Sequence, residues 1–130
     1  MVINDPAVLA EVSSVFAQYE EALVTNDVAT LDALFWDADE VVRYGGGETL
    51  YGKAEIDRFR RARAPVNLGR TVERCVITTF GQDFATASIH FSRDSAPGKQ
   101  GRQMQTWARL PEGWRVVAAH VSVIATPAAV

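Results

Sequence analysis

The sequence is poor in the residues that form disulfides and metal sites. Its 130 residues include a single cysteine, Cys75, and two histidines, His90 and His120. One cysteine excludes an internal disulfide and a cysteine-rich zinc site, so we expect Cys75 to be a small buried residue of a strand. Because no acidic cluster stands at ligand spacing from either histidine, the sequence predicts no metal site.

The chain also lacks a strong charge of either sign and any long apolar run. Its 13 basic and 16 acidic residues are mixed and leave a net charge of −3, so it has no basic surface of the kind that binds nucleic acid. No apolar stretch approaches the roughly 18 residues that a membrane span requires. The N-terminus has no basic region followed by an apolar run, as a signal peptide would. We therefore expect a cytoplasmic protein that binds neither nucleic acid nor a membrane.

The chain does have enough apolar sequence for one core. Apolar residues make up 48% of it, which is too many for a disordered chain. Its length leaves no room for a second core. We expect one domain over residues 1–130.

The N-terminal part has the 3.6-residue period of a helix. Asp5 is placed to cap it, with Pro6 at the first helical position. Apolar side chains then recur at spacings of three and four along one face. They are Val8, Val12, Val15, Phe16, Tyr19 and Leu23.

Shorter elements follow this helix. Asp27 is placed to cap a second helix, and a third helix follows Gly52. Residues 41–44 and 48–51 read as short strands, separated by the three glycines 45–47, which favour a turn or a bulge.

After residue 65 the apolar period changes from 3.6 to 2. Four strand-like runs cover roughly 70–80, 84–93, 101–110 and 114–124. The connectors after the first and third runs are short turn sequences, which favour antiparallel hairpins. Helices followed by a meander predict an α+β fold, with a curved antiparallel sheet packed on three N-terminal helices.

This order of elements resembles the nuclear transport factor 2-like and SnoaL-like superfamily. The closest local match is Thr106-Trp-Ala-Arg109, then Gly113-Trp-Arg-Val-Val117 and His120-Val-Ser122. The resemblance implies a cone-shaped, cystatin-like sheet. It also implies a pocket between the concave face of that sheet and the first and third helices.

Short motifs over nearly the whole chain narrow the resemblance. They are Asp5-Pro-Ala-Val8, Tyr19-Glu-Glu-Ala-Leu23, Leu34-Phe-Trp-Asp37, Val42-Arg-Tyr-Gly45, Glu48-x-Leu-Tyr-Gly52, Phe59-Arg-x-Ala-Arg63 and Gly101-Arg-Gln-x-Gln-Thr-Trp107. Together they are similar to the AtzH-like branch, whose members are also called oxalurate-catabolism proteins. That likeness implies a hydrolase that removes a carboxyl group from 1,3-dicarboxyurea to give allophanate, beside amidases that break down ureas and cyanuric acid.

Tyr19 and Arg43 are the residues at which the resemblance implies catalysis. Tyr19 lies on the apolar stripe of the first helix, where it is either a core tyrosine or an acid/base group at the pocket floor. A phenol needs a nearby cation to exchange a proton at neutral pH. Arg43 can supply that charge from a short apolar strand, where an arginine is seldom left unpaired.

Arg43 has two open interpretations. It either forms a structural ion pair with Asp37, Asp39 or Glu48, or it presents a fork to a carboxylate or ureido oxygen. On the third helix, Arg60 and Arg63 either lean over the pocket mouth or belong to a solvated basic face.

The last two strands offer further candidates. Trp114, Val116, Ala118, His120 and Ser122 share one face by alternation, and Gln103, Gln105 and Trp107 share one on the preceding strand. Gln105, Trp107, His120 and Ser122 are therefore expected to contact substrate. The alternative for the polar ones is a polar layer at a dimer interface. His120 with Ser122 lacks the strand-to-helix turn of a nucleophile elbow.

Two functions remain open from the sequence. One is a cofactor-free decarboxylating amidohydrolase acting on a small carboxylated urea. The other is a non-catalytic dimeric module that binds a small carboxylate or docks onto an amidase, because the superfamily contains enzymes and adaptors alike. In either case we expect a homodimer through the outer face of the sheet, which is rich in Val and Thr.

Overall fold

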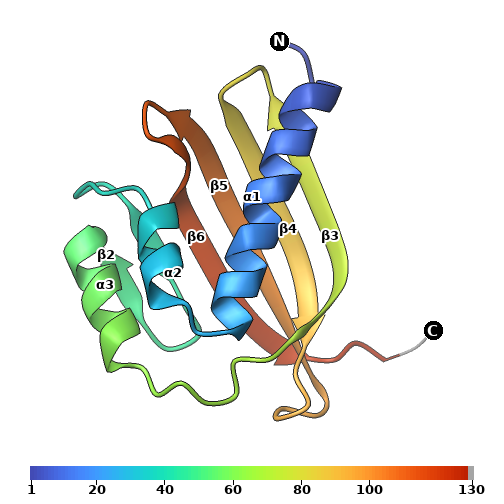
Figure 1. Ribbon diagram of the computed structural model, residues 1–130. Coiled ribbons are helices and arrows are strands. Elements are labelled where there is room, and N and C mark those ends of the chain that lie inside the picture. Colours follow the sequence, from blue (N-terminus) through green and yellow to red (C-terminus); the bar gives the residue numbers. More distant parts are fainter. Residues whose placement is uncertain (129–130) are drawn as a thin grey trace.

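The computed structural model describes residues 1–128 and has the predicted order of elements (Figure 1). The helices are α1 (Pro6–Val24), α2 (Val28–Leu34) and α3 (Lys53–Ala62). The strands are β1 (Val42–Tyr44), β2 (Thr49–Tyr51), β3 (Thr71–Phe80), β4 (Phe84–Ser92), β5 (Lys99–Leu110) and β6 (Gly113–Ala125). The predicted α+β class is confirmed. None of the described helices is long and apolar enough to cross a bilayer.

The strands form one six-stranded sheet in the order β2-β1-β6-β5-β4-β3. The hairpins β3–β4, β4–β5 and β5–β6 are antiparallel as predicted. The β1–β2 pair is also antiparallel, whereas the pairing of β1 with β6 is parallel, so the predicted antiparallel sheet is mixed at this one pair. The β1–β2 hairpin reaches β6 from the end of α2, and that direction of entry makes the pairing parallel.

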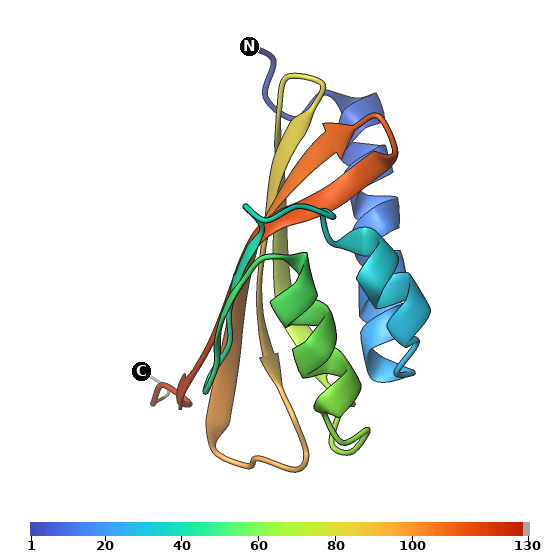
Figure 2. The ribbon, with the colours of Figure 1, turned by 90° about the vertical axis from the view of Figure 1, so that its left-hand side faces the viewer.

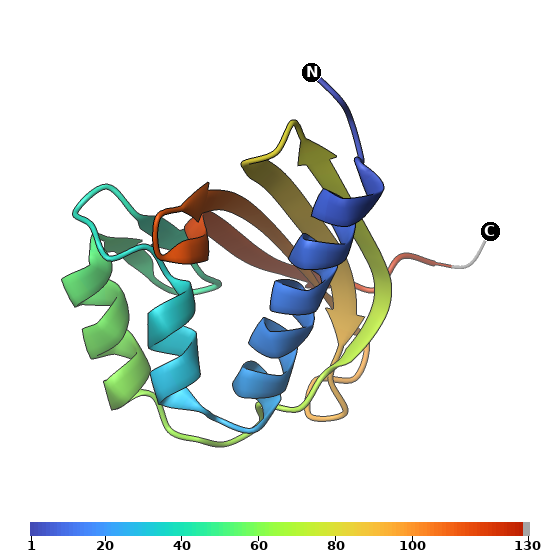
Figure 3. The ribbon, with the colours of Figure 1, turned by 45° about the horizontal axis from the view of Figure 1, so that its top comes forward.

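All three helices lie on one face of the sheet, as the edge-on view shows (Figure 2). The sheet curves around them, with α1 across the β3–β5 side and α2 and α3 toward β6 and β1 (Figure 3). We call the face under the helices the concave face and the opposite face the convex face. A helical stripe packed on alternating strand residues buries the core between these two layers.

The cap and the apolar stripe of α1 fix that helix on the concave face. The Oδ1 atom of Asp5 accepts hydrogen bonds from the backbone N–H of Ala7 at 3.0 Å and of Val8 at 3.4 Å, as expected for an N-cap. The buried residues of α1 are Val8, Val12, Phe16, Tyr19, Ala22 and Leu23.

A bulge in β6 reverses which residues of that strand face the helices. Thr106 pairs with Ala118 and Trp107 pairs with Val116, so one extra residue of β6 stands between the two pairs. Trp114 and Val116 are buried before the bulge, whereas Ala119 is the buried residue after it.

Ala118, His120 and Ser122 therefore lie on the convex face, and the prediction that they share a face with Trp114 is wrong. The His120 ring packs edge-on against Tyr44 with 5.8 Å between centroids. The Oγ atom of Ser122 accepts hydrogen bonds from Arg102 at 3.2 and 3.0 Å. Neither side chain contacts the helical layer.

The predicted burial of Cys75 is also wrong, because its side chain is exposed. It lies on β3, the edge strand of the sheet. No further strand covers that edge in the described part of the chain.

Gly101 is required by the packing of Phe91 across the β4–β5 pair. A Cβ atom at Gly101 would lie 2.1 to 2.6 Å from three atoms of the Phe91 ring. The buried Phe91 ring therefore lies directly over the glycine backbone and covers it.

We expect Gly101→Ala to lower the free energy of unfolding by about 1–3 kcal/mol, the usual cost of overpacking a core. Gly69→Ala is the control, because no heavy atom lies within 4 Å of a Cβ at that position. Urea denaturation of both variants measures the difference. Equal stability of the two variants would show that the Phe91 ring can repack around the added methyl group without cost.

Candidate functional site

Tyr19 is buried between α1 and the concave face, with 4% of its surface exposed. Its ring packs edge-on against Trp107 with 6.5 Å between centroids, and it lies 6.4 Å from both Phe16 and Phe35. These aromatic contacts hold the phenol in one position. They come from α1, the end of α2 and β5, so the position depends on tertiary packing.

Arg43 lies on the same side of the sheet. Its Cα pairs with Ala119, a buried residue of the concave face, and its guanidinium stacks on the Phe59 ring of α3 at 5.5 Å. The Nη1 atom donates to Glu48 Oε1 at 2.6 Å. A Cβ at Gly45 would lie 1.7 Å from that same oxygen, so this glycine makes room for the carboxylate.

Of the partners predicted for Arg43, Glu48 is the one that the structure shows. An arginine carries five N–H donors. Glu48 accepts a hydrogen bond from one of them, at Nη1 of Arg43. The ion pair therefore fixes the orientation of Arg43 and reduces the net positive charge around it.

Two glutamines of β5 point from the concave face with their oxygens already engaged. Gln105 accepts a hydrogen bond from Trp107 Nε1 at 3.0 Å, and Gln103 accepts one from Arg70 Nη1 at 3.2 Å. Tryptophan and arginine can only donate, so these bonds fix the orientation of both amides. The Nε2 atoms of Gln103 and Gln105 are then buried donors with no partner among residues 1–128.

Arg63 and Arg93 add two more buried donors. Arg63 is the C-cap residue of α3, and Arg93 directly follows β4. Arg63 Nη2 and Arg93 Nε have no hydrogen-bond partner in the described chain, and neither side chain takes part in any of the ion pairs found there.

Burial and like charges act on both of these guanidiniums. Burial lowers the pKa of Arg63, and the positive charges of Arg60 and Arg43 lower it further. Burial also lowers the pKa of Arg93, with smaller effects of Arg70 and Arg63 in the same direction. Tyr19 and the Glu48 carboxylate oppose the shift of the Arg63 pKa, and the Glu20 carboxylate and Tyr19 oppose that of Arg93.

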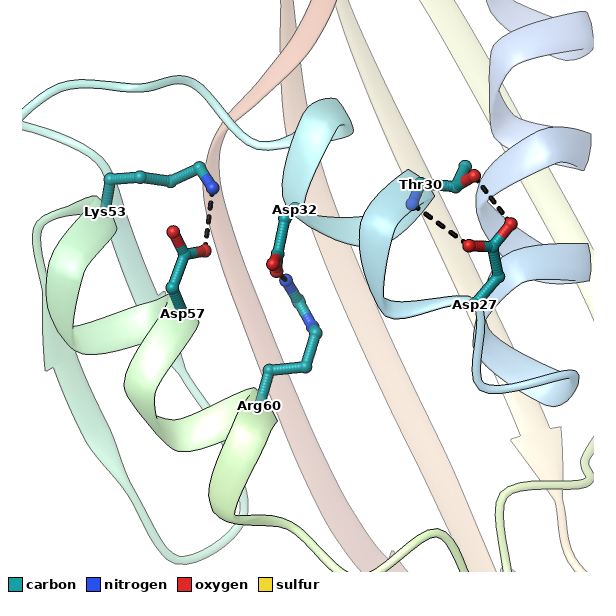
Figure 4. Close-up of polar contacts among 6 residues, drawn as sticks. All are labelled: Asp27, Thr30, Asp32, Lys53, Asp57 and Arg60. Atoms are coloured by element: carbon teal, nitrogen blue, oxygen red, sulfur yellow. Dashed lines mark hydrogen bonds and ion pairs between the residues drawn. The ribbon is translucent and has the colours of Figure 1, made fainter.

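The neighbouring arginines, in contrast, are paired. Arg70 binds both carboxylate oxygens of Glu20, and its side chain is almost fully buried. Arg60 bonds Asp32 at 3.0 Å and stacks on the Phe35 ring at 4.9 Å (Figure 4).

Arg60 therefore joins α3 to α2. Its side chain is buried, so both of its predicted interpretations, at the pocket mouth and on a solvated basic face, are wrong. The same view shows the pair of Lys53 with Asp57 along α3 and the cap of α2, where Asp27 bonds Thr30 (Figure 4).

We define the donor cluster as Tyr19, Arg63, Arg93, Gln103 and Gln105. Tyr19 contacts Trp107, which holds Gln105, and its phenol lies within electrostatic reach of both arginines. Arg70 holds Gln103 and stacks with Arg93 on the Phe91 ring, at 4.4 and 5.0 Å.

Four of the members of this cluster carry buried N–H donors that meet no acceptor in the described chain. Buried polar groups are nearly always hydrogen-bonded. The arrangement therefore suits a ligand made of acceptor oxygens, such as a carboxylate or a urea carbonyl. No three His, Cys, Asp or Glu side chains of residues 1–128 gather closely enough to hold a metal ion.

The sequence reasoning placed Tyr19, Arg43, Arg63 and Gln105 on the side where the structure has them. It missed Arg93, although alternation along 84–93 points that residue inward after Ile89 and Phe91. Trp107, predicted to contact substrate, is fully buried and supports Gln105 from behind. The free amide groups could not be read from sequence because they depend on what binds each oxygen.

Comparisons with known proteins agree with the motifs. The family model described as AtzH-like matches residues 1–127. A comparison with curated proteins finds no match.

Solved structures extend the comparison. A Pectobacterium atrosepticum protein of unknown function is 54% identical, with a TM-score of 0.92 and 95% of each chain covered. A cystatin-like fold protein from Burkholderia xenovorans is 50% identical, with a TM-score of 0.94 and 98% of this chain and 99% of that chain covered. A nuclear transport factor 2-like superfamily protein from Salmonella enterica is 24% identical, with a TM-score of 0.70 and 94% of each chain covered. The last of these is similar in fold alone.

We expect Arg93→Met and Arg70→Met to change stability in opposite directions, although both side chains stack on Phe91. Arg93→Met removes a half-buried charge that forms no ion pair among residues 1–128, and it should raise the free energy of unfolding by about 0.5–2 kcal/mol. Arg70→Met leaves Glu20 and Gln103 without their donor and should lower it by about 2–4 kcal/mol.

Denaturant unfolding in a buffer free of carboxylates and phosphate measures both changes. A loss of stability in Arg93→Met as large as that in Arg70→Met would contradict the assignment of Arg93 as unpaired.

Proposed function

The chain belongs to the AtzH-like family, and from that premise and the donor cluster we propose that it is a cofactor-free amidohydrolase that removes a carboxyl group from a small carboxylated urea. One observation carries the proposal. The concave face carries the buried phenol of Tyr19 together with buried N–H donors that meet no acceptor among residues 1–128. A carboxylated urea is small, planar and rich in acceptor oxygens, so it offers what these donors lack.

The reaction is the loss of carbon dioxide from nitrogen. The bond between the urea nitrogen and the carboxylate carbon breaks, and its electron pair stays on the nitrogen. Negative charge then develops on that nitrogen and on the adjacent ureido oxygen. A proton delivered to the nitrogen completes the product urea, and water returns a proton to the donor.

In this proposal Tyr19 is the proton donor. Its ring is held by aromatic contacts, and the hydroxyl belongs to a cluster with two guanidiniums in electrostatic reach. General acid catalysis by a positioned side chain contributes typically about 10²–10⁴-fold.

Arg43 binds the ureido oxygen. Charge on that oxygen grows as carbon dioxide leaves, so a donor aimed at it stabilises the transition state more than the bound substrate. Glu48 fixes the guanidinium through Nη1. Such preorganisation avoids reorientation of the donor during the reaction.

We expect Tyr19→Phe to reduce kcat for a 1,3-dicarboxylated urea by about 10²–10⁴-fold, because the ring still packs but no proton can be given. Arg43→Lys keeps the charge and loses the planar fork, so its kcat should also fall. Tyr51→Phe is the control, since Tyr51 is exposed on the convex face and bonds Tyr44. Release of carbon dioxide from the purified protein measures all three.

Unchanged turnover in Tyr19→Phe and Arg43→Lys would refute the catalytic assignment. Turnover that appears only when a neighbouring amidase is added would favour an accessory module that binds a carboxylate. The same assay with and without that amidase therefore separates the two functions.

We also propose that the chain forms a homodimer through the convex face. Large apolar side chains stand exposed there, among them Val76, Phe84 and Met104, the last with 63% of its surface exposed. Two hollows of about 270 Å³ each are both lined by Met104. Exposed apolar surface of this kind is typical of an interface.

Met104→Glu places a charge in the centre of that face and should convert the dimer to monomer, as measured by light scattering after gel filtration. Gln82→Glu, in the exposed turn between β3 and β4, is the control with the same added charge. A wild-type protein that is already monomeric would contradict the proposal.

A further inference from the structure

We infer that the convex face carries a second anion site, formed by Arg74, His90 and Arg102, which binds a small oxyanion such as inorganic phosphate and links it to dimerisation. The site is separate from the donor cluster, which lies on the concave face. The link to dimerisation rests on the homodimer proposed above, whereas the anion site itself does not.

The three side chains lie in one row across three neighbouring strands. Arg74 on β3 pairs with His90 on β4, and His90 pairs with Arg102 on β5. Residues directly opposite each other in a sheet project from the same face, with their Cβ atoms about 4.5–5.5 Å apart. The Cα atoms of the two arginines are therefore about 10 Å apart, with the imidazole between them. An anion above His90 is within reach of both guanidiniums.

The row borders a hollow in the convex face of about 270 Å³. The polar side chains that reach it from this face are Arg74, Ser88, His90 and Arg102, and each of them can donate a hydrogen bond. Apolar side chains, among them Met104, line the rest, and no Asp or Glu belongs to the lining. The hollow therefore offers an oxyanion several donors and no competing negative charge.

Neither arginine of the row has a carboxylate partner. None of the ion pairs found among residues 1–128 includes Arg74 or Arg102. Glu73, which precedes Arg74 at the bulge of β3, forms no ion pair there either. Like charges placed across a sheet destabilise it. A bound oxyanion would offset charges that no side chain of the described residues offsets.

Arg102 is already oriented for such a ligand. The Oγ atom of Ser122 accepts hydrogen bonds from Nε and Nη2 of Arg102 at 3.2 and 3.0 Å. These bonds fix the guanidinium and do not use the N–H donors of Nη1. Binding therefore orders few additional side-chain torsions of Arg102, which lowers its entropic cost.

The proposed homodimer brings two of these rows toward each other. Met104, an exposed residue of that interface, lines the same hollow as Arg74 and Arg102. Two packed convex faces carry two guanidiniums from each copy, and their repulsion opposes association. A ligand that binds the dimer more tightly than the monomer shifts the equilibrium toward the dimer. The dimer should therefore be tighter in phosphate than in chloride at the same ionic strength.

Methyl NMR of the full chain locates the anion. The sequence has two methionines, Met1 and Met104, so ¹³C-methyl labelling gives one signal at the hollow and one at the N-terminus. Titration with sodium phosphate against sodium chloride should move the Met104 signal along a saturable curve and leave the Met1 signal in place. Two protein concentrations separate binding from dimerisation, because dimerisation alone depends on protein concentration.

Arg102→Gln should weaken phosphate binding at the hollow by about 10-fold, as expected for the loss of a charge-assisted hydrogen bond. Arg61→Gln is the matched control, because it removes an exposed charge of α3 on the helical side of the sheet. It should leave the phosphate titration of Met104 unchanged. Turnover of a carboxylated urea should be the same in both variants, because neither residue lies in the donor cluster.

Analytical ultracentrifugation measures the link to dimerisation. At equal ionic strength, the wild type should dimerise about 10-fold more tightly in phosphate than in chloride. Arg74→Gln removes a repelling charge from each copy, so in chloride it should dimerise more tightly than the wild type. The same variant should lose most of the dependence on phosphate. A general loss of structure would weaken the dimer and produce the opposite result.

The outcomes distinguish this inference from the proposals above. A Met104 signal that does not saturate with phosphate, or that saturates equally in Arg102→Gln, would overturn the anion site. Saturable binding in a chain that stays monomeric would support the site and refute the proposed homodimer. A dimer that binds phosphate but is no tighter in it would overturn the link to dimerisation. None of these results depends on whether Tyr19 is catalytic.

Discussion

The concave face of this protein carries buried N–H donors that no acceptor of the described chain satisfies, and the chemistry proposed for the site depends on this imbalance. Arg63 Nη2, Arg93 Nε, Gln103 Nε2 and Gln105 Nε2 are all donors without a partner in the described chain. Water can accept hydrogen bonds from these groups, but only an anion also offsets the charge of the two half-buried guanidiniums. An oxygen-rich anion offers the acceptors that these donors lack, and the proposed reaction rests on that match.

The paired arginines show that the imbalance is local. Arg70, Arg60 and Arg43 each have a carboxylate partner. These partners are Glu20 on α1, Asp32 on α2 and Glu48 just before β2. The pair of Arg70 with Glu20 also supports the donor cluster, because Arg70 fixes Gln103 and stacks beside Arg93 on the Phe91 ring. An unpaired buried charge costs stability, and proteins retain such a cost at functional sites.

The bulge in β6 decides which chemistry remains on the concave face. By moving His120 and Ser122 to the convex face, it leaves a tyrosine, arginines and amides beneath the helices. These groups are suited to binding oxygens, stabilising charge and moving one proton. That set fits the loss of a carboxyl group from nitrogen, where the developing charge is spread over a ureido oxygen.

Sequence patterns determined the helices and strands of this protein, because periods, caps and turns are local properties of the chain. Asp5 and Asp27 cap helices as predicted. The four long strands lie where the alternation of apolar residues begins and ends. The motifs also determined the family and placed Tyr19 and Arg43 on the right elements. Tertiary structure alone decided the parallel β1–β6 pairing, the reversal of β6 at its bulge, and the exposure of Cys75 at the sheet edge. It also decided which arginines find a carboxylate. Partners that lie 28 or 50 residues apart, as for Arg60 with Asp32 and Arg70 with Glu20, meet only when the layers pack, and no local pattern records which guanidinium is left without one.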